Sequence, residues 1–375
     1  MSTDDNNNDT TDTTESKIDY TAEFDPDAMA IKPLEKHPLF PLAEEKKEGP
    51  SNDRQKNALA GIHRTAMDDE SFFRKEIPPR RTVLGSWFRE GSLGFIFGRR
   101  GAGKTWFAWD MAICVSRGVA YGPWKCEMPR KTLYVDGEMP LRSMQERLKL
   151  LNPNPTGNLF IMSRERLMDE ARMLLNLCEP CWQEALLTYC VEEKIKVVFL
   201  DNLSSLCWGM KENEADSWEQ VLSWLLMLRQ SGIAIIIVHH ANRDGNEMRG
   251  TSRREDAADW VIKVSPNFKF AKISTGTAFT TTFTKNREDN GDHEESMDWT
   301  FVTEDGRTNV NWKLTDIETR VYELIKSGVD LNADIAEELG ISKALVSRHA
   351  KKLIGDNFIK KEGQRYVISY DHYPR

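Results

Sequence analysis

From about residue 78 onward, short apolar runs alternate with amphipathic segments. Four runs have the length and composition of buried strands: residues 91–98, 131–138, 196–202 and 233–240. The segments between or after them have helical spacing, at residues 105–118, 141–151, 181–193 and 217–232. Strands that alternate with helices form a mainly parallel sheet that is covered on both faces. The pattern therefore predicts an α/β domain. Further strands at 260–264, 270–274, 279–286 and 297–302 extend this domain over residues 78–313.

The residues before this domain have a different composition. Residues 1–25 consist mostly of Asp, Asn and Thr, with almost nothing apolar, and predict a disordered acidic tail. Residues 26–77 contain four prolines that interrupt any long element, and predict an arm with one short helix near residues 53–68. Such an arm is either a loose tail or a clip onto a neighbouring subunit.

Residues 314–375 form a separate pattern. Helical spacing covers residues 316–327, 332–338 and 342–354, and two short strands follow at 358–362 and 365–369. Three helices and a β-hairpin describe a small winged helix-turn-helix domain, in which Gly340 supplies the tight turn and Ser342 the N-cap.

Composition narrows the class of protein. The chain has 375 residues, 39% of them hydrophobic, which allows one full core and a smaller module. The net charge of −8 is concentrated in the tail, because residues 1–25 hold eight acids against one lysine. No apolar run approaches the roughly 20 residues of a membrane span, and the first residues do not resemble a signal peptide. We therefore expect a cytoplasmic protein with no membrane contact.

The six cysteines do not indicate a metal site. Cys178 and Cys181 have the C-x-x-C spacing, but no second C-x-x-C or histidine pair completes a zinc site. Reduced structural cysteines are the favoured interpretation.

The strongest chemical motif lies between an expected strand and an expected helix. The stretch from Gly98 to Thr105 fits G-x-x-x-x-G-K-[ST] at every fixed position. Its glycines let backbone N–H groups point at phosphate oxygens, and the following helix adds its positive end. Lys104 should reach the β- and γ-phosphates of ATP, and Thr105 should hold Mg²⁺. The expected nucleotide-binding residues are Gly98, Arg99, Arg100, Gly101, Ala102, Gly103, Lys104, Thr105 and Trp106.

Hydrolysis needs further groups at the carboxyl ends of neighbouring strands. Asp201 ends an apolar strand and is the expected second Mg²⁺ anchor; the alternative is a simple helix cap. Glu138 is the expected base for the attacking water, with Asp136 as the fallback. His240 is expected to contact the γ-phosphate, whereas His239 is the more natural core histidine.

Together, five blocks of the sequence resemble the RecA-like ATPases of the RepA type, which are hexameric replicative helicases of plasmids and related mobile elements. The blocks are Gly98–Thr105, residues 136–140, residues 200–202, His239-His240 and Arg249-Gly-Thr-Ser252. The resemblance covers roughly residues 78–312. It implies a RecA-like P-loop core with Glu138 as catalytic base, and a homo-oligomeric ring with single-stranded DNA in its channel.

The resemblance also implies that a neighbouring subunit completes each site. In such rings a K-x-R pair on a late strand serves this purpose, and Lys285 and Arg287 match it. A solvated basic turn is the alternative. Arg249, Arg253 and Arg254 are further candidates, either for the same role or for contacts with single-stranded DNA.

The winged helix-turn-helix is a departure from the family, whose members need not carry one. Its second half is basic, and the residues expected to contact duplex DNA are Lys343, Ser347, Arg348, Lys351, Lys352, Lys360 and Lys361. Ala344, Leu345, Leu353 and Ile354 should form the inner face. The alternative for this module is protein contact.

Two functions follow from these expectations. One is a DNA-dependent motor, a ring-forming helicase or translocase driven by ATP and Mg²⁺. The other is an ATP-switched regulator, replication initiator or loader that binds duplex DNA without translocation. A metabolic kinase is disfavoured, because nothing in the sequence resembles a lid for an acceptor substrate.

Overall fold

The computed structural model describes residues 52–209, 215–245, 247–250, 253–267, 276–288, 295–339 and 341–369. The chain divides into two compact units, residues 1–77 and 78–375.

The first unit contains two helices, α1 (Asn52–Thr65) and α2 (Asp69–Arg74). Helix α1 confirms the short helix expected near residues 53–68. Helix α2 was not expected. It begins where the Asp68 carboxylate accepts a hydrogen bond from the Ser71 N–H at 2.7 Å. The tail expected at residues 1–25 lies outside the described residues.

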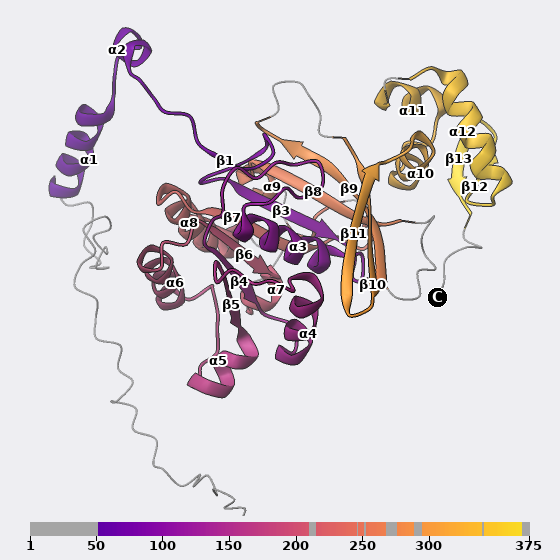
Figure 1. The fold of residues 1–375 in the computed structure, drawn as a ribbon. Coiled ribbons are helices and arrows are strands. Elements are labelled where there is room, and N and C mark those ends of the chain that lie inside the picture. The colour runs from indigo at the N-terminus through magenta and orange to yellow at the C-terminus, as the bar shows by residue number, and fades with distance from the viewer. Residues whose placement is uncertain are drawn as a thin grey trace, which may run out of the picture. The chain divides into compact units, whose positions relative to one another are not determined.

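A nine-stranded sheet organises the second unit (Figure 1). Its order is β11-β10-β9-β8-β3-β7-β6-β4-β5. The strands are β3 (Leu93–Gly98), β4 (Thr132–Asp136), β5 (Leu159–Ser163), β6 (Val197–Asp201), β7 (Ala234–His240), β8 (Trp260–Pro266), β9 (Gly276–Asn286), β10 (Met297–Glu304) and β11 (Arg307–Leu314). Strands β3 to β8 pair in parallel, whereas β9, β10 and β11 join as an antiparallel extension. A short hairpin of β1 (Thr82–Leu84) and β2 (Phe88–Arg89) precedes the sheet.

Helices cover both faces of the sheet. Alternate residues of β3 enter two different hydrophobic cores, with Ile96 in one and Phe95 and Phe97 in the other. Helices α3 (Lys104–Arg117) and α4 (Leu141–Leu151) contribute to the first core. Helices α6 (Pro180–Glu192), α7 (Leu203–Leu206) and α8 (Ala215–Gln230) contribute to the second. The two-layered covering explains why the central strands are apolar throughout.

Several elements differ from the sequence-based expectation. Strand β5, helix α5 (Arg164–Ala171) and strand β11 were not expected. Strand β11 lies at one edge of the sheet and most of its side chains are exposed, so it lacks the apolar alternation that marks a strand. A short helix, α9 (Arg253–Ala257), precedes β8. The strand expected at residues 270–274 lies outside the described residues.

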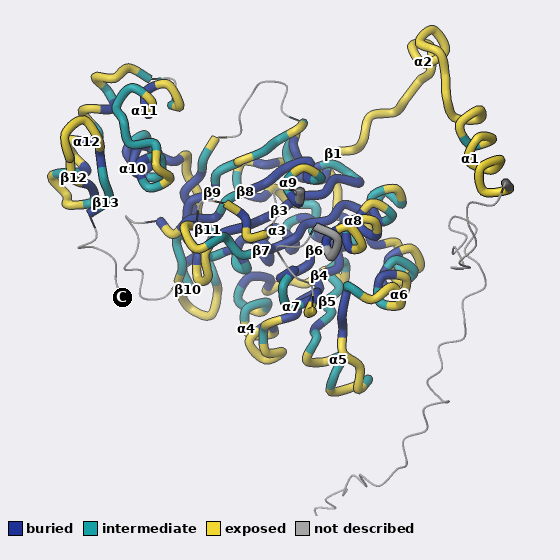
Figure 2. The backbone as a smooth tube through the Cα atoms, turned by 180° about the vertical axis from the view of Figure 1, so that it is seen from behind, coloured by how far each residue is buried: buried dark blue, intermediate teal, exposed yellow. Residues whose placement is uncertain are grey.

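The C-terminal residues form three helices and a hairpin around a core of their own. The elements are α10 (Ile317–Ser327), α11 (Asn332–Glu338), α12 (Lys343–Gly355), β12 (Ile359–Glu362) and β13 (Arg365–Ile368). Figure 2 shows buried positions inside this group and exposed positions along α12 and the hairpin. Leu331, between α10 and α11, bridges Arg365 of the hairpin.

Two details of this module differ from expectation or cannot be compared with it. The buried face of α12 is formed by Val346, Ala350 and Leu353. Leu353 therefore confirms part of the expected inner face, and Ile354 packs against the same core. Ala344 was wrong, because it is exposed and lies about half a turn away from Val346 on the helix. Gly340, the expected turn residue, lies outside the described residues. Among the described residues, no helix combines the length and apolar character needed to cross a bilayer.

Candidate nucleotide-binding site

The carboxyl ends of four parallel strands bring the predicted site residues together. In the strand register Gly98 of β3 is opposite His240 of β7, and Asp136 of β4 is opposite Asp201 of β6. These ends border a cleft of about 420 Å³. Its lining includes residues 100–106 together with Glu138, Asp201 and His240. One edge of the sheet thus gathers groups that lie up to about 140 residues apart in the sequence.

The glycine-rich loop has the backbone conformation that its sequence predicts. Gly101 and Gly103 have φ angles of 74° and 102°, in the left-handed region that favours glycine. A Cβ on Gly103 would lie 2.2 Å from the Phe279 ring, so no larger residue fits there. The loop leads directly into α3, whose amino-terminal N–H groups are available to an anion.

Lys104 is the first residue of α3 and is only 6% exposed. Its Nζ donates hydrogen bonds to the carbonyl oxygens of Gly98, at 2.9 Å, and Arg99, at 2.8 Å. Burial lowers the pKa of Lys104 to about 8, while the nearby Asp201 and Glu138 carboxylates oppose that shift. The ammonium is therefore held against the loop that would surround a phosphate group.

Thr105 and Asp201 supply an oxygen pair suited to Mg²⁺. The Thr105 side chain hydrogen-bonds to Asp201, and the Tyr134 hydroxyl donates to the same carboxylate at 2.6 Å. Burial raises the pKa of Asp201, although these hydrogen bonds oppose the shift. A carboxylate and a hydroxyl are the hard ligands that Mg²⁺ prefers in nucleotide sites. The residues present therefore fit this ion.

Two carboxylates follow β4, and the structure gives them different surroundings. Asp136 accepts hydrogen bonds from the backbone N–H groups of Glu138, at 2.9 Å, and Met139, at 2.7 Å. It is buried, and this burial raises the pKa of Asp136 to about 6. Glu138 is exposed and lines the cleft, where its carboxylate accepts a hydrogen bond from the Asn202 amide. Asp136 thus shapes the turn that presents Glu138.

The two adjacent histidines also differ. His239 is fully buried, and its Nε2 lies 2.8 Å from the Arg249 carbonyl oxygen and 2.7 Å from an Arg254 nitrogen. Burial and the Arg254 charge lower the pKa of His239 to about 3. His240 lines the cleft, with its Nε2 3.4 Å from the Asn202 amide nitrogen. His240 is therefore the histidine placed to contact a nucleotide.

The sequence analysis missed two residues that line the cleft, Asn202 and Arg147, and one buried behind it, Tyr134. Tyr134 holds Asp201, and Asn202 contacts both Glu138 and His240. Arg147, on α4, lies over the Trp106 ring at 4.4 Å and lines the cleft. Burial lowers the pKa of Arg147, while nearby acidic groups raise it. The sequence signal for Arg147 was the amphipathic pattern of residues 141–151, which predicts that the side of α4 carrying Arg147 faces the sheet.

Lys285 and Arg287 do not reach this cleft in their own subunit. Their side chains donate hydrogen bonds to backbone carbonyl oxygens of Glu255 and Asp256. Lys285 is opposite Val261, near the start of β8, whereas the phosphate loop follows the end of β3. At about 3.3 Å per residue, these positions are roughly 13 Å or more apart along the strands. Both cations therefore lie toward the amino ends of the parallel strands, whereas the cleft lies at their carboxyl ends.

The other arginine candidates have mixed outcomes. Arg254 is 1% exposed, with its guanidinium against His239 and 5.4 Å from the Trp218 ring. This buried position excludes Arg254 from contact with DNA or with a neighbour's nucleotide and corrects that expectation. Arg249 is exposed and lines a pocket beside His240. The side chain of Arg253 lies outside the described residues.

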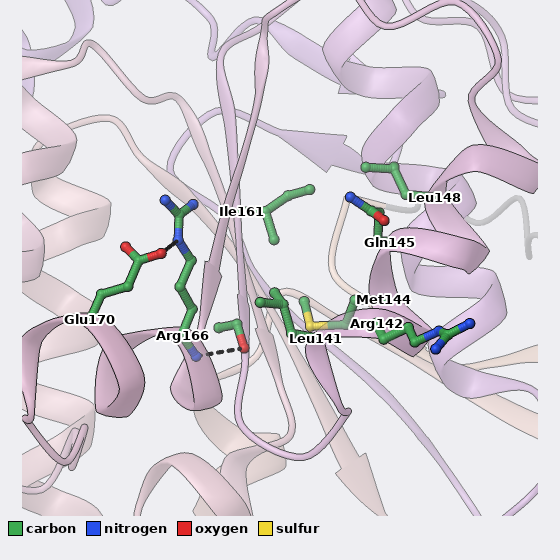
Figure 3. Close-up of a pocket in the computed structure, with 9 residues that line it drawn as sticks. Leu141, Arg142, Met144, Gln145, Leu148, Ile161, Arg166 and Glu170 are labelled. Atoms are coloured by element: carbon green, nitrogen blue, oxygen red, sulfur yellow. Dashed lines mark hydrogen bonds and ion pairs between the residues drawn. The ribbon is translucent and has the colours of Figure 1, made fainter. Parts of the chain in front are cut away.

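A separate pocket of about 560 Å³ lies between α4, β5 and α5 (Figure 3). Its centre is apolar, with Met144, Leu148 and Ile161, and Arg166 pairs with Glu170 at its rim. It carries neither a glycine-rich loop nor a paired acid for a metal ion. It is therefore distinct from the nucleotide cleft in its chemistry.

All seven candidate DNA-contacting residues of the C-terminal module are exposed. They are Lys343, Ser347, Arg348, Lys351, Lys352, Lys360 and Lys361. Ser347 accepts a hydrogen bond from the Asn332 amide at 2.8 Å. Lys352 also has a partner inside the module, because its Nζ lies 2.8 Å from the carboxylate of buried Glu318, which raises the pKa of Lys352. Lys352 thus neutralises a buried acid of the module.

Residues 62–246 match a family model described as an AAA domain. The match spans just under half of the chain and contains the phosphate loop, Glu138, Asp201 and His240. It supports a P-loop ATPase. The matched segment ends before Lys285 and before the C-terminal module.

Other comparisons add less. No curated protein matches the chain. The flagellar accessory protein FlaH from Methanocaldococcus jannaschii is 12% identical, with a TM-score of 0.41, over 59% of this chain and 90% of that chain. A KaiC-like protein from Pyrococcus horikoshii is 17% identical, with a TM-score of 0.42, over 62% of this chain and all of that chain. At these values neither similarity carries a functional conclusion.

Proposed function

We propose that this protein hydrolyses ATP and couples hydrolysis to DNA, as a ring-forming replicative helicase or translocase of the RepA type. The observation that carries the ATPase part is the convergence of four groups on one cleft. These are the glycine-rich loop with Lys104, the Thr105–Asp201 oxygen pair, the Glu138 carboxylate and His240.

Each group has a chemical task in this proposal. Backbone N–H groups of the loop and the Lys104 ammonium bind the β- and γ-phosphates. Thr105 and Asp201 would hold Mg²⁺, which would supply positive charge against the phosphates when bound. Glu138 accepts a proton from the attacking water, and His240 contacts the γ-phosphate oxygens. Arg147 adds a cation at the wall of the same cleft.

The positions of Lys285 and Arg287 support assembly into a homo-oligomer. Both cations lie toward the amino ends of the parallel strands, away from their own phosphate loop at the carboxyl ends. Such cations reach a triphosphate only when another subunit presents its cleft to them. A closed ring satisfies this condition for every subunit, and the family likeness favours a hexamer.

Two surfaces support DNA as the partner. Beside His240, a pocket of about 680 Å³ is lined by Arg99, Arg100, Arg243 and Arg249, which suits the phosphates of a single strand. The C-terminal module supports a winged helix-turn-helix, because its hairpin follows the third helix and a bridge ties Leu331 to that hairpin. The exposed cations of α12 and the hairpin suit the phosphates of duplex DNA.

The C-terminal module also favours a second candidate function. An ATP-switched regulator, replication initiator or loader would use ATP to assemble on duplex DNA through α12, without translocation. The exposed cations of α12 and the hairpin fit this role as well as they fit the role of bringing a motor to duplex DNA. The two functions differ in whether single-stranded DNA accelerates hydrolysis.

The deciding experiment measures ATP hydrolysis at fixed salt without DNA, with single-stranded DNA and with duplex DNA. A Glu138→Gln variant serves as the blank, because it keeps the nucleotide contacts and removes the base. Strong stimulation by single strands supports the motor. Slow hydrolysis that ignores single strands, together with ATP-dependent duplex binding, supports the regulator. Normal turnover by the Glu138→Gln variant would contradict the base assignment.

A further inference from the structure

Asn202 lies directly after the metal-binding candidate Asp201 and begins α7. The Gly137 N–H donates a hydrogen bond to the carbonyl oxygen of Asp201, the last residue of β6, at 2.8 Å, so the pairing with β6 continues one residue past the end of β4. This contact places the next residues of the two segments, Glu138 and Asn202, side by side. Asn202 is 3% exposed, so water cannot readily replace its partners.

Helix α7 fixes the orientation of the Asn202 side chain. The side-chain oxygen accepts a hydrogen bond from the Ser205 N–H at 3.1 Å. In return, the Asn202 N–H donates to the Ser205 hydroxyl at 3.3 Å, which completes a capping box. Because the oxygen is held by the helix, the amide nitrogen must face the cleft.

The amide nitrogen has two N–H groups and two neighbours in the cleft. One neighbour is the Glu138 carboxylate, which accepts a hydrogen bond from it. The other is His240 Nε2, at 3.4 Å. Burial lowers the pKa of His240, which favours the neutral ring, and in a neutral imidazole one ring nitrogen can accept a hydrogen bond. A single buried amide thus links the carboxylate and the imidazole.

We propose that Asn202 is the positioning residue of the hydrolytic centre, and that it holds the Glu138 carboxylate in place and ties it to His240. This inference rests on the proposed role of Glu138 as the base. Asn202 acts through these two residues and makes no direct contact with phosphate in the proposal. Its loss should therefore slow the chemical step and leave ATP binding intact.

The first test uses Asn202→Ser, which removes the amide without adding charge. Serine is a good N-cap, so the Ser205 N–H keeps an acceptor and α7 keeps its start. We expect kcat to fall roughly 10- to 100-fold, the usual effect of a lost hydrogen bond to a charged group. The dissociation constant of a fluorescent Mg²⁺–ATP analogue should stay within about threefold of the wild-type value, since the phosphate contacts remain. A kcat within twofold of wild type would overturn the proposal.

The second test reverses the hydrogen bond. Asn202→Asp sets two carboxylates side by side and should lower the melting temperature. Adding Glu138→Gln returns an amide to the pair, now on residue 138, and should restore most of that loss. This cycle reads the contact itself, independently of turnover. Additive changes in melting temperature would show that the two side chains do not interact and would overturn the proposal.

Ser205→Ala is the matched control. It removes the hydroxyl half of the capping box and leaves the Asn202 amide and its acceptors in place. We expect a lower melting temperature with kcat nearly unchanged. A fall in kcat equal to that of Asn202→Ser would assign the effect to α7 rather than to the amide and would overturn the proposal.

The failure of this inference is distinguishable from failure of the proposed function. If Glu138→Gln retains turnover, the base assignment falls, and the inference falls with it. If Glu138→Gln is inactive while Asn202→Ser turns over normally, only the positioning role of Asn202 is wrong.

Discussion

The nucleotide cleft and the C-terminal module present their functional side chains in opposite ways. In the cleft, Lys104, Asp201 and Asn202 are at most 6% exposed, and each is held by hydrogen bonds to other protein groups. In the module, Arg348 and Lys351 are exposed cations on one helix. Groups held in place affect catalysis through their exact positions. Exposed charges affect binding through their number, and salt in the solution screens them. The two regions should therefore respond differently to the same kind of substitution.

The largest expected effect is at Lys104. Lys104→Ala should lower ATP turnover at least about a hundredfold, because a preorganised cation is lost from the phosphate site. Arg100→Ala is the matched comparison, since Arg100 is a neighbouring but exposed cation of the same loop. Steady-state ATPase assays of both variants measure the difference. Equal losses would show that burial does not distinguish the two cations.

The next effect concerns the backbone of the loop. Gly103→Ala should destabilise the protein by about 3 kcal/mol, because the new Cβ meets Phe279 and φ is positive. Gly101→Ala shares the positive φ but meets nothing within 4 Å, and should cost about 1 kcal/mol. Denaturant unfolding of the two variants tests the comparison. Equal costs would place the entire penalty in the backbone angle.

A smaller effect is expected at the exposed cations. Arg348→Ala combined with Lys351→Ala should weaken duplex DNA binding. The slope of log K against the logarithm of the salt concentration should become shallower by about two, one for each lost phosphate contact. Basal ATP hydrolysis should not change. Binding titrations at several salt concentrations provide the measurement. Unaltered duplex affinity would move the module to the class of protein-contact domains.

The smallest effect separates two neighbouring lysines. Lys352→Ala should lower the melting temperature of the chain slightly, because it leaves buried Glu318 without this cation. Lys351→Ala should not, because its side chain points to solvent. The order should reverse for duplex binding, where loss of Lys351 matters more. Identical melting temperatures would indicate that the Lys352–Glu318 pair contributes nothing.

The sequence predicted the parts of the site that depend on local pattern. The glycine-rich loop and the apolar strands are local signals, and parallel strands bring their carboxyl ends to one edge, so Asp201 and His240 were placed without a structure. Arg147 and Tyr134 were missed because their roles depend on which helix and strand faces meet across the sheet. Arg254 was misplaced because a buried arginine has no local signature in the sequence.

The difference between local sequence signals and packing contacts also explains where the predicted fold was wrong. Strand β11 is an exposed edge strand, so its residues lack the apolar alternation that marks a half-buried strand. In α12, the choice of Ala344 for the inner face failed because an alanine fits either side of an amphipathic helix. Only the packing against α10, α11 and the hairpin fixes the face that Val346 and Ala350 occupy.

The placement of Lys285 and Arg287 has a consequence for mixtures of chains. If each cation pair serves the cleft of another subunit, a subunit that lacks Arg287 still has a competent cleft of its own but disables its neighbour. Adding such chains to wild-type protein would then remove more activity than their share of the total. Turnover per chain would also rise with protein concentration, because an isolated subunit lacks part of its own site.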